Sequence, residues 1–317
     1  MDSGFRELES SENTSRVRSA ESTLPSRGSV IGLAAAWGQY PVTIARALKR
    51  QGYRVCCVAL KDLADPILKE ICDDHREVGL ARMGAAIRFF RRCGVTHATM
   101  AGKIHKKVIF ERFSWIRHTP DWRFIRTFFP HWALRTKDRR DDTLVAAIVA
   151  EFAKDGIVFA PATQFAPELL VSEGVLAGRC PSAAIGRDIA FGWQIAKQLG
   201  GLDVGQSVAV KGQAVIAVEA IEGTDECIRR AGELCPSGGF TVVKVAKPQQ
   251  DMRWDVPTIG IGTIESLAAA GGKTLAIEAG MTIVVEEDAV RRLAQRLGIT
   301  VVALRQPPAL CETAEAA

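Results

Sequence analysis

The residues best suited to chemistry are acidic side chains in two loops of the second half of the chain. The first loop runs from Glu222 to Asp225 (EGTD), directly after a strand-like run and before a helical one. Thr224 is expected to cap that helix, and the unpaired amides of a first helical turn attract anions. For Glu226 we prefer the alternative that an acid there complements the helix macrodipole. Glu222 and Asp225, on either side of Gly223, favour a functional site.

The second loop is KPQQDMRWDVP, from Lys247 to Pro257. Prolines restrict it near both ends, and it holds Asp251 and Asp255 beside Arg253. Taken alone, this composition is typical of a solvated loop with compensating charges. Both acidic loops, however, follow strands that are expected to be neighbours in one sheet. Their carboxylates would then meet at one sheet edge.

Carboxylates gathered with Lys and Arg, without a cage of His or Cys, favour Mg²⁺ or another divalent cation. Such an ion takes one or two protein carboxylates together with substrate phosphates. None of the five histidines has the spacing of a zinc site, and no Ser-His-Asp or Cys-His motif is present. The eight cysteines show no CxxC spacing and are interpreted as reduced thiols of a cytoplasmic protein.

Length and composition predict a globular protein of two domains. The chain has 317 residues, 47% of them hydrophobic and 24% charged, and a net charge of +5. No apolar run reaches the ~20 residues of a spanning helix, so any lipid contact would be peripheral. Residues 1–28 lack the apolar run of a signal peptide and are expected to be a disordered tail, and 306–317 is assigned as a second tail.

The elements that must position the acidic loops indicate an α/β protein. Between Ser29 and Leu60, a strand, a glycine loop, a helix and a second strand form a βαβ unit. Pro41 suits the first turn of its helix and Gly52 the helix C-terminus. We therefore predict an N-terminal domain over residues 29–163 with a Rossmann-like open parallel sheet.

The rest of this domain continues the alternation of helices and strands. VGLARMGAAIRFFRRCG is expected to be helical and VTHATMAG to be a strand. Asp141 and Asp142 open a further helix, where acids favour the positive end, and IVFA closes the sheet. Gly38 and Gly102 lie at strand ends, the side of such a sheet where ligands bind.

A C-terminal mixed α/β domain is predicted over residues 167–305. It begins with the helix AAIGRDIAFGWQIAKQLG, followed by a hairpin, QSVAVKGQAVIAVEA, that turns at Lys211 and Gly212. Strands and helices then alternate as far as TVVAL. The acidic loops belong to this domain, which we expect to be catalytic.

Residues 103–140 form a basic segment with interleaved aromatic side chains. Nucleic-acid binding, docking on a membrane surface and a plain linker are three interpretations. Short clusters of bulky apolar groups favour the lipid surface over nucleic acid. The loop AAAWGQYP has one glycine where a dinucleotide fingerprint has three. A nucleotide-dependent oxidoreductase and a nucleic-acid-binding module therefore stand as alternative functions.

Three motifs in the second domain occur in an order that resembles one known family. They are IAVEAIEGTDE from Ile216, KPQQDMRWDVPTIG from Lys247 and AIEAGMTIVV from Ala276. They resemble the I-type UDP-2,3-diacylglucosamine pyrophosphatase of lipid A biosynthesis, the LpxI family. RDIAFGWQIAKQLGGLDVGQSV extends the resemblance over nearly all of the domain. IGLAAAWGQYP, MAGKI and DDTL are similar in the first domain, with departures at Ala36, Trp37 and Tyr40.

The resemblance implies metal-dependent hydrolysis of the diphosphate of UDP-2,3-diacylglucosamine to UMP and 2,3-diacylglucosamine 1-phosphate (lipid X). The lipid-linked UDP-sugar would lie between the domains, and water would be the nucleophile. The protein would be cytoplasmic or bound at the inner face of the membrane, with no nucleic-acid partner and no oligomeric state assigned.

Asp251 would be the most critical carboxylate, with Asp225, Glu222 and Asp255 as further catalytic residues. The same resemblance assigns Asp251, Asp225 and Glu222 as ligands of Mg²⁺ or another divalent cation. The expected substrate-binding residues are Gly223, Thr224, Lys244, Lys247, Gln250, Arg253, Gly38, Tyr40, Gly102, Lys103, Asp142 and Thr143.

Overall fold

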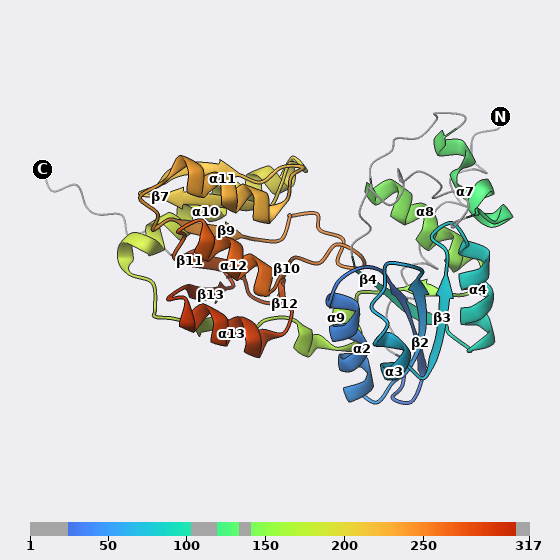
Figure 1. Cartoon of the computed structure of the whole chain (residues 1–317). Helices are drawn as coiled ribbons and strands as arrows, with labels where there is room; N and C mark the ends of the chain where they lie inside the picture. Colours follow the sequence, from blue (N-terminus) through green and yellow to red (C-terminus); the bar gives the residue numbers. More distant parts are fainter. Residues whose placement is uncertain (1–24, 103–118, 133–140, 309–317) are drawn as a thin grey trace, which may run out of the picture.

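The structure, a computed structural model, describes residues 25–102, 119–132 and 141–308. Two α/β units lie side by side, the one built from the first half of the chain and the other from the second (Figure 1). Lys103, most of the basic segment 103–140 and most of both predicted tails fall outside the described ranges. The predicted α/β class is confirmed.

The N-terminal sheet has the strand order β3-β2-β1-β4-β5 within these ranges, and each pairing is parallel. Its strands are β1 (Val30–Ala35), β2 (Arg54–Leu60), β3 (Asp74–Val78), β4 (His97–Ala101) and β5 (Val158–Phe159). The inner strands are nearly continuous apolar runs because both faces of the sheet are covered by helices. The predicted Rossmann-like open parallel sheet is confirmed.

Helices cover the two faces of this sheet in separate groups. One face packs against α2 (Tyr40–Arg50), α3 (Leu68–Ile71), α9 (Ala162–Phe165) and the 3-10 turn η1 (Pro167–Leu169). The other packs against α4 (Met83–Arg92), α7 (Trp122–Trp132) and α8 (Asp141–Ala153). α7 lies within the basic segment and contacts both α4 and α8.

Local signals in this domain succeeded where the sequence was apolar or contained a helix-end residue. Pro41 lies in the first turn of α2, and Gly52 follows that helix with a φ of +85°, so both predictions are confirmed. The helix predicted from Val78 is confirmed as α4, but its start was placed five residues too early, because α4 begins at Met83 and Val78 ends strand β3. The β3 sequence, DHREV, is polar because it is an edge strand with little to bury.

The C-terminal sheet has the order β6-β13-β11-β9-β7-β8 in the described part of the chain. Its strands are β6 (Gly174–Ala177), β7 (Ser207–Lys211), β8 (Ala214–Val218), β9 (Thr241–Lys244), β11 (Thr274–Glu278) and β13 (Thr300–Leu304). β9, β11 and β13 are parallel, and β7 runs antiparallel to both β8 and β9. β8 therefore runs in the same direction as β9.

Helix α10 (Ala183–Gly201) packs on one face of this sheet. The other face is covered by α11 (Thr224–Leu234), α12 (Ile261–Ala269) and α13 (Glu287–Arg296). The predicted hairpin is confirmed, but its turn was placed one residue too early. Lys211 pairs with Ala214, and Gly212 and Gln213 make the turn with φ values of +60° and +58°.

A small second sheet joins the two domains. β10 (Thr258–Ile259) and β12 (Ile283–Val284) pair in parallel beside the main C-terminal sheet. Ile283 and Val285 are buried in the same apolar core as α2 and α9 of the N-terminal domain. The two domains therefore share part of one core. No helix among residues 25–102, 119–132 and 141–308 is both long and apolar enough to cross a membrane.

Candidate functional site

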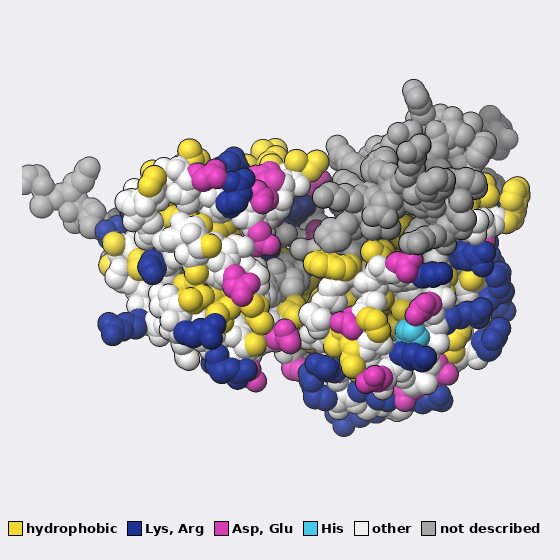
Figure 2. Space-filling model, viewed as in Figure 1, with side chains coloured by type: hydrophobic (Ala, Val, Ile, Leu, Met, Phe, Trp, Pro, Cys, Tyr) yellow, Lys and Arg dark blue, Asp and Glu magenta, His cyan; other side chains and the backbone are white. Residues whose placement is uncertain are grey.

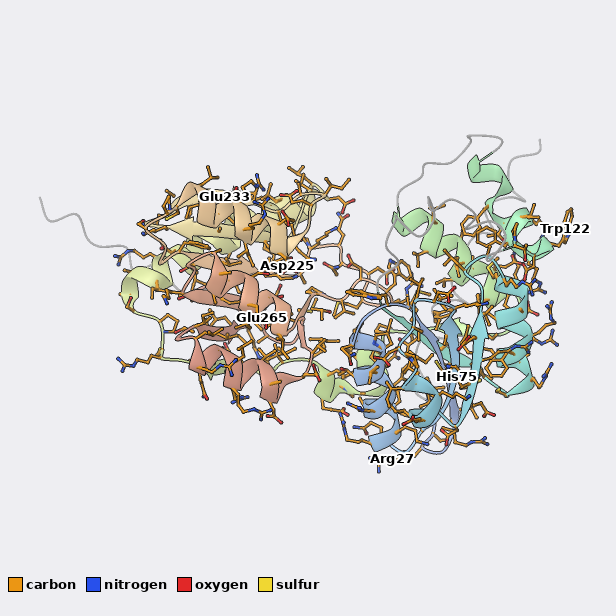
Figure 3. All side chains as sticks on the ribbon, viewed as in Figure 1. Arg27, His75, Trp122, Asp225, Glu233 and Glu265 are labelled. Atoms are coloured by element: carbon orange, nitrogen blue, oxygen red, sulfur yellow. The ribbon has the colours of Figure 1, made fainter. Side chains whose placement is uncertain are left out.

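The two predicted acidic loops leave the C-terminal sheet at the same edge. EGTD follows β8 and the loop 247–257 follows β9, and these strands run in the same direction. The expectation that the two strands are neighbours was wrong, because β7 lies between them. Two strand spacings separate them by about 10 Å. Figure 3 places Asp225 at the side of the C-terminal domain that faces the N-terminal domain.

A buried polar cluster links the two strand ends. The Nζ atom of Lys244, the last residue of β9, donates to Thr224 Oγ1 at 2.9 Å. Thr224 Oγ1 in turn donates to Glu219 Oε1 at 3.0 Å and lies 3.3 Å from Ser207 Oγ. Lys244, Glu219 and Ser207 are all buried. Two predicted substrate-binding residues, Lys244 and Thr224, are therefore in direct contact.

This cluster also corrects the role expected for Thr224. The N-cap of α11 is Gly223, with a φ of +85° and no side-chain cap, and Thr224 is the first helical residue. Its hydroxyl bonds to side chains instead of the helix amides. Glu219 was not singled out from the sequence, although an acid at the end of the apolar run AVIAV is a detectable signal. A buried carboxylate requires such partners.

The two acids of the EGTD loop have different surroundings. Glu222 Oε1 accepts a hydrogen bond from Arg230 Nη2 at 2.5 Å, and the same guanidinium donates to the carbonyl of Val218. Glu222 is thus tied back to α11. Asp225 is exposed in the first turn of that helix, where its carboxylate lies close to the helix N-terminus.

Asp251 is held by its own loop. Both of its carboxylate oxygens accept from the guanidinium of Arg253, Oδ1 from Nε at 2.9 Å and Oδ2 from Nη2 at 2.7 Å. The Arg253 guanidinium also lies over the ring of Trp254, 4.4 Å from its centroid. Two parallel hydrogen bonds fix the orientation of a carboxylate more strongly than one. The loop therefore presents Asp251 in a defined direction.

Gln250 holds the backbone of this loop, while the side chain of Lys247 pairs outside it. Gln250 Oε1 accepts from the amide of Lys247 at 2.8 Å, and Gln250 Nε2 donates to the carbonyl of Asp255 at 2.6 Å. The Nζ atom of Lys247 pairs with Asp203 at 2.6 Å. Gln250 thus closes the loop from Lys247 to Asp255, which keeps Asp251 at its tip.

The start of this loop is fixed by an ion pair that the sequence analysis did not identify. Lys197 of α10 donates to Glu278 Oε1 and Oε2 at 2.8 and 2.7 Å and to the carbonyl of Ala246 at 2.9 Å. Glu278 Oε2 also accepts from the Ala246 amide at 2.8 Å. Both backbone groups of Ala246 are therefore held, five residues before Asp251. Glu278 lies in the motif AIEAG, which is the signal that could have identified it.

Two of the predicted N-terminal residues, Gly38 and Gly102, follow the C-terminal ends of β1 and β4. Gly38 and Gly102 have φ values of +106° and +98°. A Cβ atom at Gly102 would come within 2.7 Å of the Ala36 carbonyl carbon, so this glycine permits close approach of two backbones. Tyr40 is the first residue of α2, and burial raises the pKa of its hydroxyl. Asp142 and Thr143 lie in the first turn of α8.

An apolar cavity of about 450 Å³ opens at this same side of the N-terminal sheet. It lies between the strand ends and the inner faces of α4, α7 and α8. Trp254, from the acidic loop of the other domain, also lines it. Its other large apolar lining residues are Leu60, Leu80, Met83, Phe90, Met100, Phe124, Phe128, Leu144, Ile148, Phe152 and Phe159. Apolar ligand groups and the acidic loop would therefore be adjacent.

The donor set suits a hard cation with few protein ligands. Within the described ranges, no three His, Cys, Asp or Glu side chains are close enough to hold a metal ion together. Glu222, Asp225 and Asp251 thus do not form a ready three-carboxylate site. Carboxylate oxygens are nevertheless the ligands that Mg²⁺ uses, usually one or two of them with substrate phosphates completing the shell. The metal assignment stays a prediction.

Comparisons with known proteins match nearly all of both domains. Residues 30–169 match the family model of the LpxI N-terminal domain, and residues 172–302 match that of the LpxI C-terminal domain. The chain is also similar to the UDP-2,3-diacylglucosamine pyrophosphatase LpxI of Caulobacter vibrioides. The two are 31% identical over 278 residues, which cover 86% of this chain and 96% of that protein.

Proposed function

This chain belongs to the LpxI family, and we propose that it hydrolyses the diphosphate of UDP-2,3-diacylglucosamine to UMP and 2,3-diacylglucosamine 1-phosphate. One observation supports this beyond the resemblance. The apolar cavity of the N-terminal domain reaches Trp254, three residues from Asp251 in the acidic loop. A substrate with two acyl chains and a diphosphate needs such an apolar space directly beside a polar edge.

Cleavage of a phosphoanhydride requires that the charge on the attacked and leaving groups be neutralised. Lys244, at the strand end, and Arg253, in the loop, supply fixed positive charge on the C-terminal domain. Arg253 also orients Asp251 through two hydrogen bonds, which favours Asp251 as the carboxylate that positions the attacking water. The buried Glu219 holds Thr224 in place to contact a phosphate.

We propose Mg²⁺ as the cofactor. Asp251 and Asp225 are the carboxylates that would hold it, with Glu222 as a third candidate. A bound divalent cation lowers the energy of the charge that develops on the phosphoryl oxygens. Arg253 and Arg230 already pair with Asp251 and Glu222, so the chain can keep these carboxylates oriented before a cation binds.

A lipid-linked substrate is presented at a membrane surface. We propose that the protein is cytoplasmic, makes peripheral contact with the inner face of the membrane and has no nucleic-acid partner. The described residues include no helix that could cross the bilayer, which is compatible with such contact.

The decisive experiment measures UMP release from UDP-2,3-diacylglucosamine in detergent micelles, with Mg²⁺ and with a chelator. The purified chain is expected to release UMP only when Mg²⁺ is present. Asp251→Ala should lower the turnover number by about 100-fold or more, the usual effect of losing a group that acts in proton transfer or water positioning.

Asp288→Ala provides the matched control, because Asp288 is an exposed aspartate on α13 of the same domain. Its turnover should equal that of the unmodified chain. Near-normal turnover of a folded Asp251→Ala protein would show that the proposed site is wrong. Absence of UMP release from the unmodified chain in Mg²⁺ would refute the proposed reaction itself.

A further inference from the structure

We infer that the outer surface of α4 and α7 docks on an anionic lipid bilayer. The α4–α7 face is defined by Arg88 and Arg92 of α4 and by Trp122 and Ile125 of α7. This inference rests on the proposed function, because it explains how a lipid-linked substrate reaches the cavity. It is carried by the exposure, the charge and the position of these four side chains.

Helix α7 carries apolar side chains on two neighbouring faces. Phe124 and Phe128 face inward and line the cavity. Trp122 and Ile125, three residues apart and so on one side of the helix, remain 75% and 40% exposed. Figure 3 shows Trp122 at the outer tip of the N-terminal domain, away from the C-terminal domain. The core therefore gives no reason for an exposed tryptophan there.

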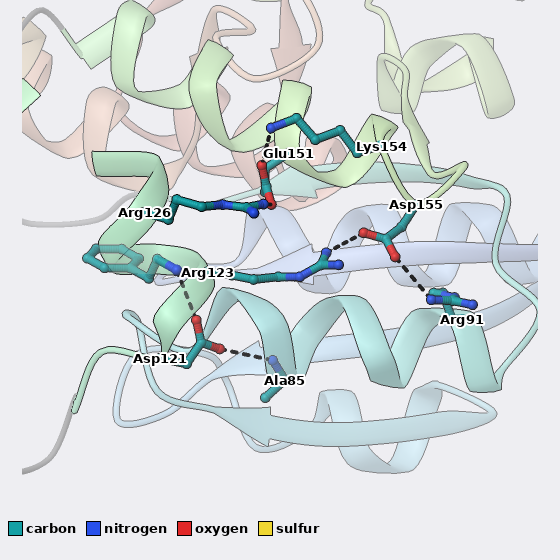
Figure 4. Close-up of polar contacts among 9 residues, drawn as sticks. Ala85, Arg91, Asp121, Arg123, Arg126, Glu151, Lys154 and Asp155 are labelled. Atoms are coloured by element: carbon teal, nitrogen blue, oxygen red, sulfur yellow. Dashed lines mark hydrogen bonds and ion pairs between the residues drawn. The ribbon is translucent and has the colours of Figure 1, made fainter. Parts of the chain in front are cut away.

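Arginines beside this tip fall into two groups. Figure 4 shows the first group, in which Arg91 and Arg123 bind Asp155 while Arg126 and Lys154 bind Glu151. These pairs fasten α7 to α4 and α8. These four cations share two carboxylates, one of them the buried Glu151, and each takes part in an ion pair, so their role is to hold the helix in place.

The second group is exposed on α4. Arg88 and Arg92 lie four residues apart on one side of the helix, and neither has an ion-pair partner among the residues that the structure describes. Arg88 Nη1 lies 3.4 Å from the position of a Cβ atom at Gly84, beside Arg123 and Asp121 at the start of α7. Figure 2 shows Lys and Arg side chains gathered over this edge, next to the hydrophobic tip. The positive and the apolar groups thus form one continuous surface.

The chemistry of this surface selects a bilayer as its partner. Arginine heads attract anionic headgroups, while a tryptophan and a branched apolar side chain insert at the boundary between headgroups and acyl chains. A nucleic-acid site would place aromatic rings in a groove for stacking, whereas Trp122 lies at the outer tip of the N-terminal domain.

The position of the surface connects it to the cavity. Met83 and Phe90 on the inner side of α4 line the same cavity as Phe124 and Phe128 of α7. Docking of the α4–α7 face would therefore bring the bilayer to within about one helix diameter, roughly 10 Å, of the cavity wall. Acyl chains would then move from the bilayer to the cavity over a short path.

The test is co-sedimentation of the full chain with vesicles of phosphatidylglycerol and phosphatidylethanolamine at low ionic strength. Reversing two arginine charges in Arg88→Glu/Arg92→Glu should weaken binding by roughly 30-fold or more. Trp122→Ser/Ile125→Ser should weaken it by on the order of tenfold through loss of apolar contact. The unmodified chain should bind vesicles of pure phosphatidylcholine poorly.

Arg292→Glu/Arg296→Glu is the matched control. These exposed arginines on α13 have the same spacing, and Arg296, like Arg92, lies in the last turn of its helix. This control should change binding less than threefold. The inference would be overturned if both test variants, Arg88→Glu/Arg92→Glu and Trp122→Ser/Ile125→Ser, bound anionic vesicles as well as the control does.

Two further measurements separate this inference from the proposed reaction. UMP release in detergent micelles should be unchanged in Arg88→Glu/Arg92→Glu, because no bilayer is needed there. Vesicle binding is measured without turnover, so it tests the docking surface even if the chain releases no UMP. The chain could instead bind single-stranded RNA more tightly than anionic vesicles at equal ionic strength, and lose that binding in Arg88→Glu/Arg92→Glu. This result would assign the surface to nucleic acid and refute docking on lipid.

Discussion

Replacing Lys197 with methionine tests whether the ion pair behind the acidic loop positions Asp251. Methionine keeps the length of the side chain but removes the ammonium group that binds Glu278 and the Ala246 carbonyl. The Lys197 and Glu278 side chains are 30% and 12% exposed, so the carboxylate would lose its cation in a mostly dry environment. A hydrogen bond to a charged group contributes about 1.5 to 3 kcal/mol to stability. Removing one partner of a partly exposed ion pair costs less free energy than removing one partner of a fully buried pair.

We therefore expect Lys197→Met to lower the free energy of unfolding by about 2 to 3 kcal/mol in urea titrations. Adding Glu278→Gln removes the unpaired charge and should restore about 1 kcal/mol of this loss. Turnover should fall about tenfold with little change in KM, because the loop carrying Asp251 directly follows Ala246, whose backbone the ion pair holds.

Lys273→Met is the matched control, since Lys273 is exposed and precedes β11 at the opposite edge of the same sheet. Lys273→Met should change neither the free energy of unfolding nor the turnover number measurably. If Lys197→Met unfolded within 0.5 kcal/mol of the unmodified chain, as a surface substitution does, and kept its turnover, the positioning role would be refuted.

Two other predictions concern the N-terminal domain. Gly102→Ala should lower the free energy of unfolding by more than about 2 kcal/mol, because its Cβ would meet the Ala36 backbone at 2.7 Å in a positive-φ conformation. Gly38→Ala, with no atom within 4 Å of the new Cβ, should cost only about 1 to 2 kcal/mol in urea unfolding, and equal losses would contradict the close approach. The hydrogen bond from Arg123 holds the pKa of Asp155 below its ordinary value of 3.8. The stability that this pair contributes is therefore present above about pH 4, and it is lost as the pH falls through the lowered pKa of Asp155 in the folded protein. The protection of the α7 amides against hydrogen exchange, relative to the intrinsic exchange rate at each pH, should fall below pH 4 in the unmodified chain. In Asp155→Asn this protection should already be low at pH 6, and full protection in that variant would exclude the Arg123–Asp155 pair as the anchor of α7.

Apolar runs and helix-end residues were enough to predict the framework of the fold. The runs VIGLAA and RVCCVAL predicted β1 and β2, and Pro41 and Gly52 marked the two ends of α2. These signals succeed because the buried positions of a strand or helix recur with the period of that element, and apolar residues occupy them. The polar strand β3 has no such periodicity, since an edge strand buries few side chains. No strand was predicted there, and its last residue, Val78, was included in the following helix.

Strand order and the partners of charged side chains were decided only by the tertiary structure. Local patterns predicted the hairpin of β7 and β8, but nothing in them indicates that β7 lies between the two acidic loops. Lys197 reaches Ala246 across 49 positions of the chain and Glu278 across 81. Trp254 of one domain lines a cavity of the other. The sequence by itself determined which residues carry charge and which elements present them. Long-range packing decided which of them meet, because contacts between distant residues have no period that a local pattern can show.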